Sequence, residues 1–143
     1  MGKCYNSVTL NASIGDVWAT VKDFHDFSWA PEVITKLEKV GDQDGGTPGA
    51  KRILNDLFHE TLLSIDDANK ILTYSIDDGP EPVSKQSVSN YVGTVRAYSV
   101  TNDDTSFLEW SSSYDSPNDQ AVGDFCNPIY QALLSALKTH FIQ

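Results

Sequence analysis

The chain has 143 residues, the length of a single domain with a substantial hydrophobic core. It carries 20 acidic and 10 basic residues, a formal net charge of −10 that disfavours nucleic acids and anionic membrane surfaces as main partners. No apolar run is long enough to span a bilayer and no secretory signal pattern is visible, so we expect a cytoplasmic protein without stable membrane insertion.

The residues that most often bind metals or carry covalent chemistry form no complete motif. His59-Glu60 begins like a zinc-protease motif, but Leu63 stands where the second histidine would be needed. Cys4 and Cys126 are too few for a disulfide framework, and neither lies among basic residues that would activate a thiol. We therefore expect no metal and no cofactor, and both cysteines should be small core residues.

The N-terminal part of the chain predicts one strand and two short helices. Weak alternation over residues 3–10 favours a strand, and Asn11 or Ser13 can cap the first helix. The apolar side of that helix consists of Ile14, Val17, Trp18 and Val21. The aromatic segment over residues 24–31 has room for a second helical turn before its proline.

After this segment, strand-like runs alternate with turns rich in Gly, Pro, Asn and Asp. The predicted strands cover residues 33–40, 50–54, 57–65, 71–76, 86–100 and 106–114. Helices segregated from a series of hairpin-connected strands indicate an α+β fold with an antiparallel sheet. No repeat or linker is visible, so we expect one domain over residues 1–143.

The last segment predicts a long amphipathic helix. Asn127 is a good N-cap and Pro128 suits the first helical position, but the apolar pattern continues upstream, so the helix could also begin near Asn118 and kink at Pro128. Its apolar stripe consists of Ile129, Tyr130, Leu133, Leu134, Leu137 and Phe141. Such a helix needs a concave apolar sheet face to pack against.

The order of these elements and several short motifs together resemble a known superfamily. The motifs are Ile14-Gly-Asp-Val-Trp18, Trp29-Ala-Pro31, Gly49-Ala-Lys-Arg52, Glu60-Thr-Leu62, Leu72-Thr-Tyr74, Asn90-Tyr91 and Leu108-Glu-Trp110. The chain resembles the START/SRPBCC helix-grip superfamily, most of all its polyketide cyclase/dehydrase and lipid-transport group. The stretch over residues 60–67 and Asn90-Tyr91 also resemble plant abscisic acid receptors.

The resemblance implies a helix-grip fold, in which a curved antiparallel seven-stranded sheet wraps round the long C-terminal helix. It also implies an apolar cavity between the sheet and the helix. The chain departs from the receptors in one respect: the turn at Asn55-Asp56 is too short to hold a gate loop like their Ser-Gly-Leu-Pro-Ala. Hormone sensing of that kind is therefore not expected.

The pairing of residues 50–54 with residues 57–65 has two possible registers. A three-residue loop places Arg52 opposite Glu60, with both side chains able to point inward, whereas a two-residue turn places Arg52 opposite His59. The resemblance favours the first register. Glu60 then contacts the ligand, or it serves only to hold Arg52 in place.

Strand alternation and the resemblance together suggest a set of ligand-binding residues. These candidates are Trp29, Arg52, Glu60, Leu62, Tyr74, Tyr91, Trp110, Phe125, Ile129 and Leu133. The last three would form the roof and Trp29 the mouth of the cavity. Gly93 and Ala97 on the same face would leave volume for a ligand, unless they only accommodate large neighbours.

We expect a binding module for a small hydrophobic or amphipathic molecule, such as a lipid, a polyketide or an aromatic metabolite. A first alternative is an enzyme of the aromatase/cyclase or dehydratase type that uses Glu60 as its acid or base. The sequence offers no convincing acid–base pair, so we favour a carrier over an enzyme. A second alternative is an interaction module whose cavity is filled by its own side chains; no protein partner is indicated.

Overall fold

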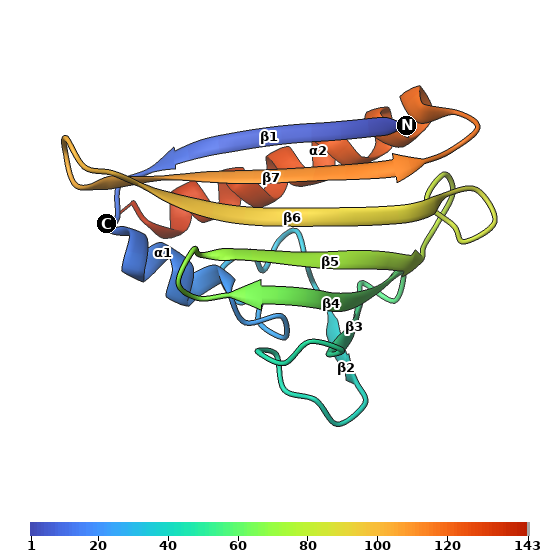
Figure 1. Cartoon of the computed structure of the whole chain (residues 1–143), viewed down its shortest axis with the longest axis horizontal. Coiled ribbons are helices and arrows are strands. Elements are labelled where there is room, and N and C mark those ends of the chain that lie inside the picture. Colours follow the sequence, from blue (N-terminus) through green and yellow to red (C-terminus); the bar gives the residue numbers. More distant parts are fainter. Residues whose placement is uncertain (143) are drawn as a thin grey trace.

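Seven antiparallel strands form one open sheet in the order β1-β7-β6-β5-β4-β3-β2 in the computed structural model, which describes residues 1–142 (Figure 1). The strands are β1 (Gly2–Leu10), β2 (Leu37–Val40), β3 (Lys51–Leu54), β4 (Phe58–Asp66), β5 (Ile71–Asp78), β6 (Ser89–Val100) and β7 (Thr105–Asp115). Two helices, α1 (Ile14–Val21) and α2 (Asp119–His140), complete the described elements. The predicted helix-grip fold, with its seven-stranded antiparallel sheet and long C-terminal helix, is confirmed.

Helix α1 begins where the sequence predicts. The hydroxyl of Ser13 accepts a hydrogen bond from the backbone N–H of Asp16 at 3.4 Å, which satisfies one of the free N–H groups of the first turn. Val17, Trp18 and Val21 are the buried residues of this helix. It packs against β6 and β7 and so covers one end of the sheet.

The prediction of a second short helix after β1 is wrong. The chain instead forms turns, in which Ala30 N–H donates to the carbonyl of Phe27 at 2.9 Å and Ile34 N–H donates to that of Ala30 at 3.0 Å. Pro31 disfavours a helical conformation in the residue before it. Trp29 and Ala30 are both buried, so this segment follows the shape of the core rather than a helix axis.

Helix α2 runs unbroken from Asp119, the upstream of the two predicted starts. The Asn118 side chain caps it by accepting a hydrogen bond from Ala121 N–H at 3.1 Å. Pro128 lies inside the helix, where it removes one backbone donor. The buried stripe that holds the helix in place consists of Val122, Cys126, Tyr130, Leu133, Leu134 and Leu137. Because these residues recur at steps of three and four, packing of this face outweighs the lost hydrogen bond.

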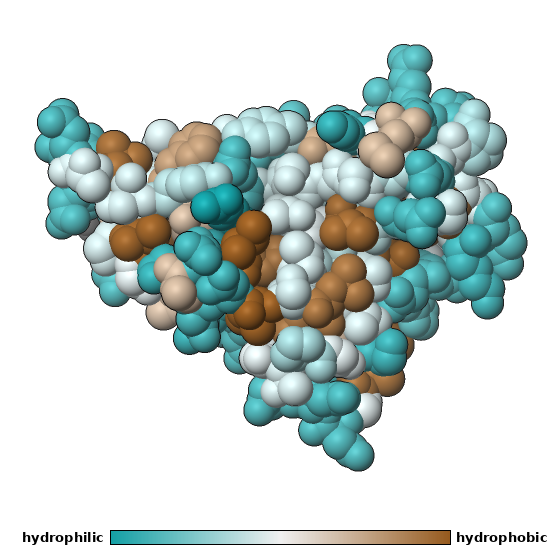
Figure 2. Space-filling model, viewed as in Figure 1, coloured by the Kyte–Doolittle hydropathy of each residue, from teal (hydrophilic) through white to brown (hydrophobic). Residues whose placement is uncertain are grey.

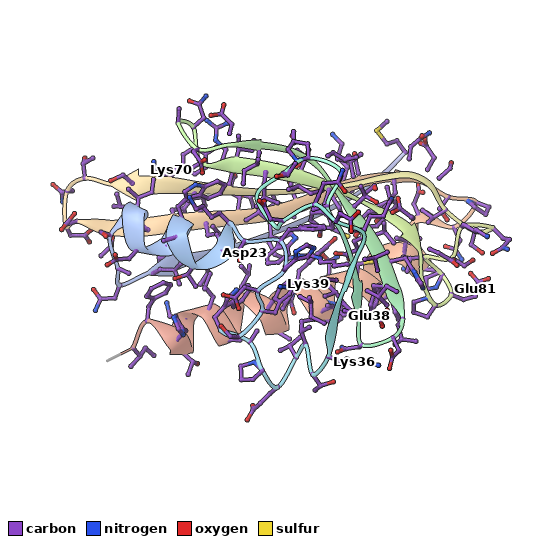
Figure 3. The ribbon with its side chains drawn as sticks, turned by 90° about the horizontal axis from the view of Figure 1, so that it is seen from below. Asp23, Lys36, Glu38, Lys39, Lys70 and Glu81 are labelled. Carbon is purple, nitrogen blue, oxygen red and sulfur yellow. The ribbon has the colours of Figure 1, made fainter. Side chains whose placement is uncertain are left out.

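The sheet and α2 form two layers with the core between them. Helix α2 runs behind β1 and β7 in the view of Figure 1 and packs against both strands. Figure 3 shows the two layers from below. The labelled residues Lys36, Glu38 and Lys39 mark β2 and the segment before it, and this part of the chain extends toward α2. No helix within residues 1–142 combines the length and hydropathy needed to cross a bilayer.

The sheet buries one face by strict alternation. Every second side chain of β7 is buried from Ser106 to Tyr114, and the outer face is mostly polar, with hydrophobic residues in separate groups (Figure 2). On β4, Leu63 is an extra residue between the pairs Leu62–Tyr74 and Ser64–Thr73. An extra residue of this kind bends its strand, which helps the sheet to curve over α2.

The register of β3 and β4 is the first of the two considered above. Arg52 pairs with Glu60 and Leu54 pairs with Phe58, so the connection has three residues. Asn55 and Asp56 have φ angles of 54° and 57°, a left-handed conformation that Asn and Asp tolerate better than most residues. Arg52 and Glu60 therefore both point into the core, where they are only 5% and 6% exposed.

Candidate ligand-binding site

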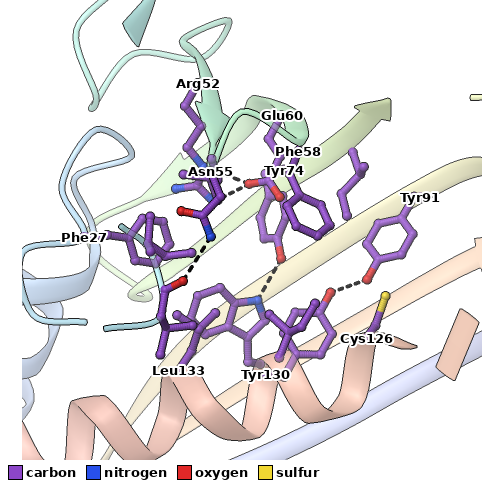
Figure 4. Close-up of a pocket in the computed structure, with 16 residues that line it drawn as sticks. Phe27, Arg52, Asn55, Phe58, Glu60, Tyr74, Tyr91, Cys126, Tyr130 and Leu133 are labelled. Atoms are coloured by element: carbon purple, nitrogen blue, oxygen red, sulfur yellow. Dashed lines mark hydrogen bonds and ion pairs between the residues drawn. The ribbon is translucent and has the colours of Figure 1, made fainter. Parts of the chain in front are cut away.

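A cavity of about 130 Å³ lies between the sheet and α2, with a mostly apolar lining (Figure 4). Strands β3 to β7 provide one side and α2 provides the other. Residues of the turns before β2 close a third side. Seven of the ten predicted ligand-binding residues line this cavity: Arg52, Glu60, Tyr74, Tyr91, Trp110, Ile129 and Leu133.

The other three candidates lie elsewhere. Leu62 is completely buried in the core and does not border the cavity. Phe125 is half-buried and its ring centre lies 6.2 Å from that of Phe58, which does line the cavity. Trp29 does not line the cavity: it is buried, and its ring centre lies 5.2 Å from that of Phe27, which is the aromatic residue of this segment that lines the cavity.

Several lining residues were missed by sequence reasoning. Cys126 and Tyr130 lie one helical turn from the predicted Ile129 and Leu133, so helix periodicity could have identified them. Val33 and Ile34 were predicted to begin a strand over residues 33–40, but β2 starts only at Leu37, and these two residues lie in the irregular segment before it. The remaining missed residues are Phe27, Leu54, Asn55, Phe58 and Ile76.

The small residues of β6 do not enlarge the cavity. A Cβ atom at Gly93 would lie 2.2 Å from Cζ of Tyr74, the residue paired with it on β5. The space above Gly93 is therefore occupied by the Tyr74 ring. Ala97 does not border the cavity either, so of the two possibilities considered from the sequence, accommodation of a large neighbour is the one observed at Gly93.

Arg52 and Glu60 form a buried ion pair at the cavity wall. Nε and Nη2 of Arg52 both donate to Oε1 of Glu60, at 2.8 and 2.6 Å, and Nη1 donates to the carbonyl of Phe24 at 3.0 Å. The guanidinium carbon also lies 3.7 Å from the ring centre of Phe24 and 4.8 Å from that of Phe27. This arrangement compensates the buried charge through one carboxylate, one carbonyl and two aromatic faces.

The ion pair sets the electrostatics of the cavity. Burial raises the pKa of Glu60, and the charge and hydrogen bonds of Arg52 oppose that rise. Arg52 and Glu60 are the only charged residues that line the cavity within residues 1–142. The cavity therefore holds one positive and one negative group, which together carry no net charge.

Uncharged polar side chains continue from the ion pair toward α2. The indole N–H of Trp110 donates to the hydroxyl of Tyr74 at 2.8 Å, and the hydroxyls of Tyr91 and Tyr130 are hydrogen-bonded to each other. Burial raises the pKa of all three phenols, and it raises the pKa of the Cys126 thiol to about 11. These groups therefore stay protonated near neutral pH and can orient a ligand but not remove a proton from it.

One wall of the cavity depends on Asn55. Its Oδ1 accepts hydrogen bonds from the backbone N–H groups of Thr35 and Lys36, at 2.8 and 3.2 Å. Its Nδ2 donates to the carbonyl of Val33 at 3.0 Å. Since Val33 and Ile34 line the cavity, Asn55 joins this irregular wall to the turn between β3 and β4.

Within residues 1–142, no group of three or more His, Cys, Asp or Glu side chains is arranged so that it could hold a metal ion.

Comparisons with known proteins agree with this architecture. A family model described as "Polyketide cyclase / dehydrase and lipid transport" matches residues 1–141. A solved structure of a protein from Nitrosospira multiformis is 40% identical, covers 99% of this chain and 97% of its own, and has a TM-score of 0.95. The protein XoxI from Bacillus cereus is 26% identical, covers 100% of this chain and 97% of its own, and has a TM-score of 0.82.

A plant protein shares the fold at lower identity. Major latex-like protein 151 from Panax ginseng is 14% identical, with 99% of this chain and 98% of its own covered and a TM-score of 0.78. No curated protein matches the chain. The family model and the Nitrosospira structure cover almost the whole sequence. The chain therefore belongs to the polyketide cyclase/dehydrase and lipid-transport family of the SRPBCC helix-grip superfamily.

Proposed function

We propose that the protein binds one small, mainly apolar molecule in the cavity between the sheet and α2. The observation that carries this proposal is the cavity itself, about 130 Å³ of space with a mostly apolar lining that adjoins the hydrophobic core. Protein interiors leave few voids larger than a water molecule. An apolar cavity of about 150 Å³ in another protein takes up benzene, so this volume suits a ligand of one or two rings.

The volume also separates the ligand classes considered from the sequence. An aromatic metabolite fits the cavity at its present size. A whole lipid or polyketide chain would need about 300 Å³ or more, the range usual for ligand pockets, and so would require the cavity to widen. The alternative of an interaction module with a filled core loses support, because the core retains this space.

A second candidate function is a cyclase or dehydratase, and one observation favours it. Glu60 is a carboxyl group at the cavity whose pKa is raised by burial, the property that suits a general acid or base near neutral pH. Its hydrogen-bonded partner is Arg52 rather than a second proton-transfer group. The Glu60→Gln variant separates the two functions, since it abolishes turnover in an enzyme and only weakens binding in a carrier.

The test of the binding function is native mass spectrometry of gently purified protein, compared with the same protein after extraction with organic solvent. We expect a discrete additional mass that extraction removes. Leu133→Trp fills the cavity and should prevent retention of this mass, whereas Gln131→Trp places the same side chain on the exposed side of α2 and should not. Retention by Leu133→Trp contradicts the proposed site. If the protein carries no extra mass and also binds neither indole nor 1-benzofuran, the proposed function is wrong.

A further inference from the structure

We propose that the ligand is an uncharged molecule that donates one hydrogen bond, from an N–H or O–H group on a compact apolar body, to Oε2 of Glu60. This inference rests on the proposed function and names the chemical class that the cavity selects. Three observations support it: the unequal use of the two Glu60 oxygens, the balance of charge, and the existing partners of the other polar groups.

The two oxygens of the Glu60 carboxylate are used unequally. Oε1 accepts both hydrogen bonds from Arg52, while Oε2 accepts none from any residue between 1 and 142. Glu60 is 6% exposed, it lines the cavity, and its carboxylate lies between Arg52 and the ring of Phe58 in Figure 4. Oε2 is not among the fully buried unpaired atoms of the described residues, so it faces accessible space, and a ligand that brings an N–H or O–H group there gains a hydrogen bond to a charged acceptor.

The charge balance of the cavity disfavours an anionic ligand. Arg52 supplies the only positive charge in the described lining, and Glu60 neutralises it at hydrogen-bond distance. A carboxylate ligand would lose its hydration without meeting a net positive charge, and it would approach the negative oxygen of Glu60. A cationic ligand would approach the guanidinium of Arg52, so an uncharged donor fits best.

The other polar side chains of the cavity already have partners within the protein. The Tyr74 hydroxyl accepts from Trp110, and the hydroxyls of Tyr91 and Tyr130 bond to each other. The amide of Asn55 bonds to the backbone of the wall before β2. Oε2 of Glu60 is the one charged acceptor in the described lining that has no protein donor, so it offers an incoming donor the strongest hydrogen bond, while the aromatic rings contact its apolar body.

Two pairs of compounds of nearly equal shape test this inference on the unmodified protein. Indole and 1-benzofuran differ in one N–H donor, and benzyl alcohol and benzoate differ in charge. Binding is followed by NMR through the indole N–H of Trp110, which borders the cavity. Trp18, whose indole N–H bonds to Asp67 at 2.8 Å away from the cavity, serves as the internal control.

We expect indole to bind at least about tenfold more tightly than 1-benzofuran, as a hydrogen bond to a buried charged acceptor allows, and benzyl alcohol to bind more tightly than benzoate. Equal affinities within the first pair, or tighter binding of benzoate, would overturn this inference and leave the proposed function standing. If none of the four compounds shifts the Trp110 signal in a saturable way, this inference is overturned, and the proposed function fails with it when the purified protein also carries no extractable mass.

The double variant Arg52→Met/Glu60→Leu provides a matched control. It replaces the ion pair by apolar side chains of similar size, so indole and 1-benzofuran should bind with affinities within about twofold of each other. A preference for indole that persists in this variant would assign the donor recognition to another group and overturn the inference. If the variant does not fold, the comparison of the two pairs on the unmodified protein still decides.

Discussion

The guanidinium of Arg52 lies over the ring of Phe24, with its carbon 3.7 Å from the ring centre, while it holds Glu60 through two hydrogen bonds to one oxygen. Residues from the segment after α1, from β3 and from β4 are thereby joined at one point of the cavity wall. The pair is almost completely buried. Removal of one partner would leave the other charge in the core without compensation.

The ion pair should therefore show strong coupling in unfolding experiments. We expect Glu60→Leu alone or Arg52→Met alone to lower the free energy of unfolding by about 3–5 kcal/mol. The double variant Arg52→Met/Glu60→Leu should be close to the unmodified protein or more stable, because no buried charge remains. Urea denaturation followed by circular dichroism measures all four proteins. Additive losses in the double variant would show that the pair is not coupled as the structure implies.

Asn55 should control the order of the wall before β2. Asn55→Ala removes the hydrogen bonds to Thr35, Lys36 and Val33 and also strains a residue whose φ is 54°. Asn55→Gly removes the same hydrogen bonds but tolerates that φ angle. Hydrogen exchange should show faster exchange of the Thr35 and Lys36 amides in both variants, and the Ala variant should be less stable than the Gly variant by about 1 kcal/mol. Unchanged exchange at these two amides would mean that Asn55 does not hold the wall.

Gly93 should resist even a single added methyl group. In Gly93→Ala the new Cβ would meet the Tyr74 ring at 2.2 Å, so the ring or the strand must move, and we expect a loss of about 1–3 kcal/mol in stability. The matched control is Gly15→Ala in α1, where a Cβ meets nothing within 4 Å. That change should stabilise the protein by about 0.5–1 kcal/mol. Thermal unfolding of both variants measures the difference, and a neutral Gly93→Ala would contradict the close approach of Tyr74.

The Cys126 thiol should react slowly in the folded protein. Burial raises its pKa to about 11, so the reactive thiolate is only roughly one part in a thousand at pH 8. In a Cys4→Ala background, the rate of alkylation by iodoacetamide should rise steadily as the pH increases from 8 toward 11. In urea the rate should already be high near pH 8.5, because the pKa of an unfolded cysteine is about 8.5. A folded protein that reacts as fast as the unfolded one at pH 8 would refute this assignment.

Alkylation of Cys126 also reports on the cavity, because this residue lines it. Saturating indole should slow the reaction of the folded protein further. The same concentration of indole should leave the rate in urea unchanged, which controls for an effect on the reagent.

The elements that recur with a regular period followed from the sequence. The three- and four-residue steps of α2 predicted a buried stripe, and Tyr130, Leu133, Leu134 and Leu137 of that stripe are buried, whereas Ile129 and Phe141 are only partly buried. The upstream start of α2 was one of two predictions because Pro128 is compatible with either position, and tertiary packing of the residues before it decided the choice. The sequence also allowed two registers between β3 and β4. The structure has the register that pairs Arg52 with Glu60, and it contains a turn with left-handed backbone conformations at Asn55 and Asp56.

Features that depend on the volume left between packed side chains required the tertiary structure. The sequence left open whether Gly93 makes space for a ligand or accommodates a large neighbour, and the ring of Tyr74 from the adjacent strand fills that space. Trp29 was expected at the mouth, but it is buried, and Phe27 is the aromatic residue of this segment that lines the cavity. The spacing of hydrophobic residues along a helix or strand indicates which of its faces is buried, and this spacing is a local property of the chain. Cavity shape depends on side-chain conformations and contacts between residues far apart in sequence, and those are decided only when all the elements pack together.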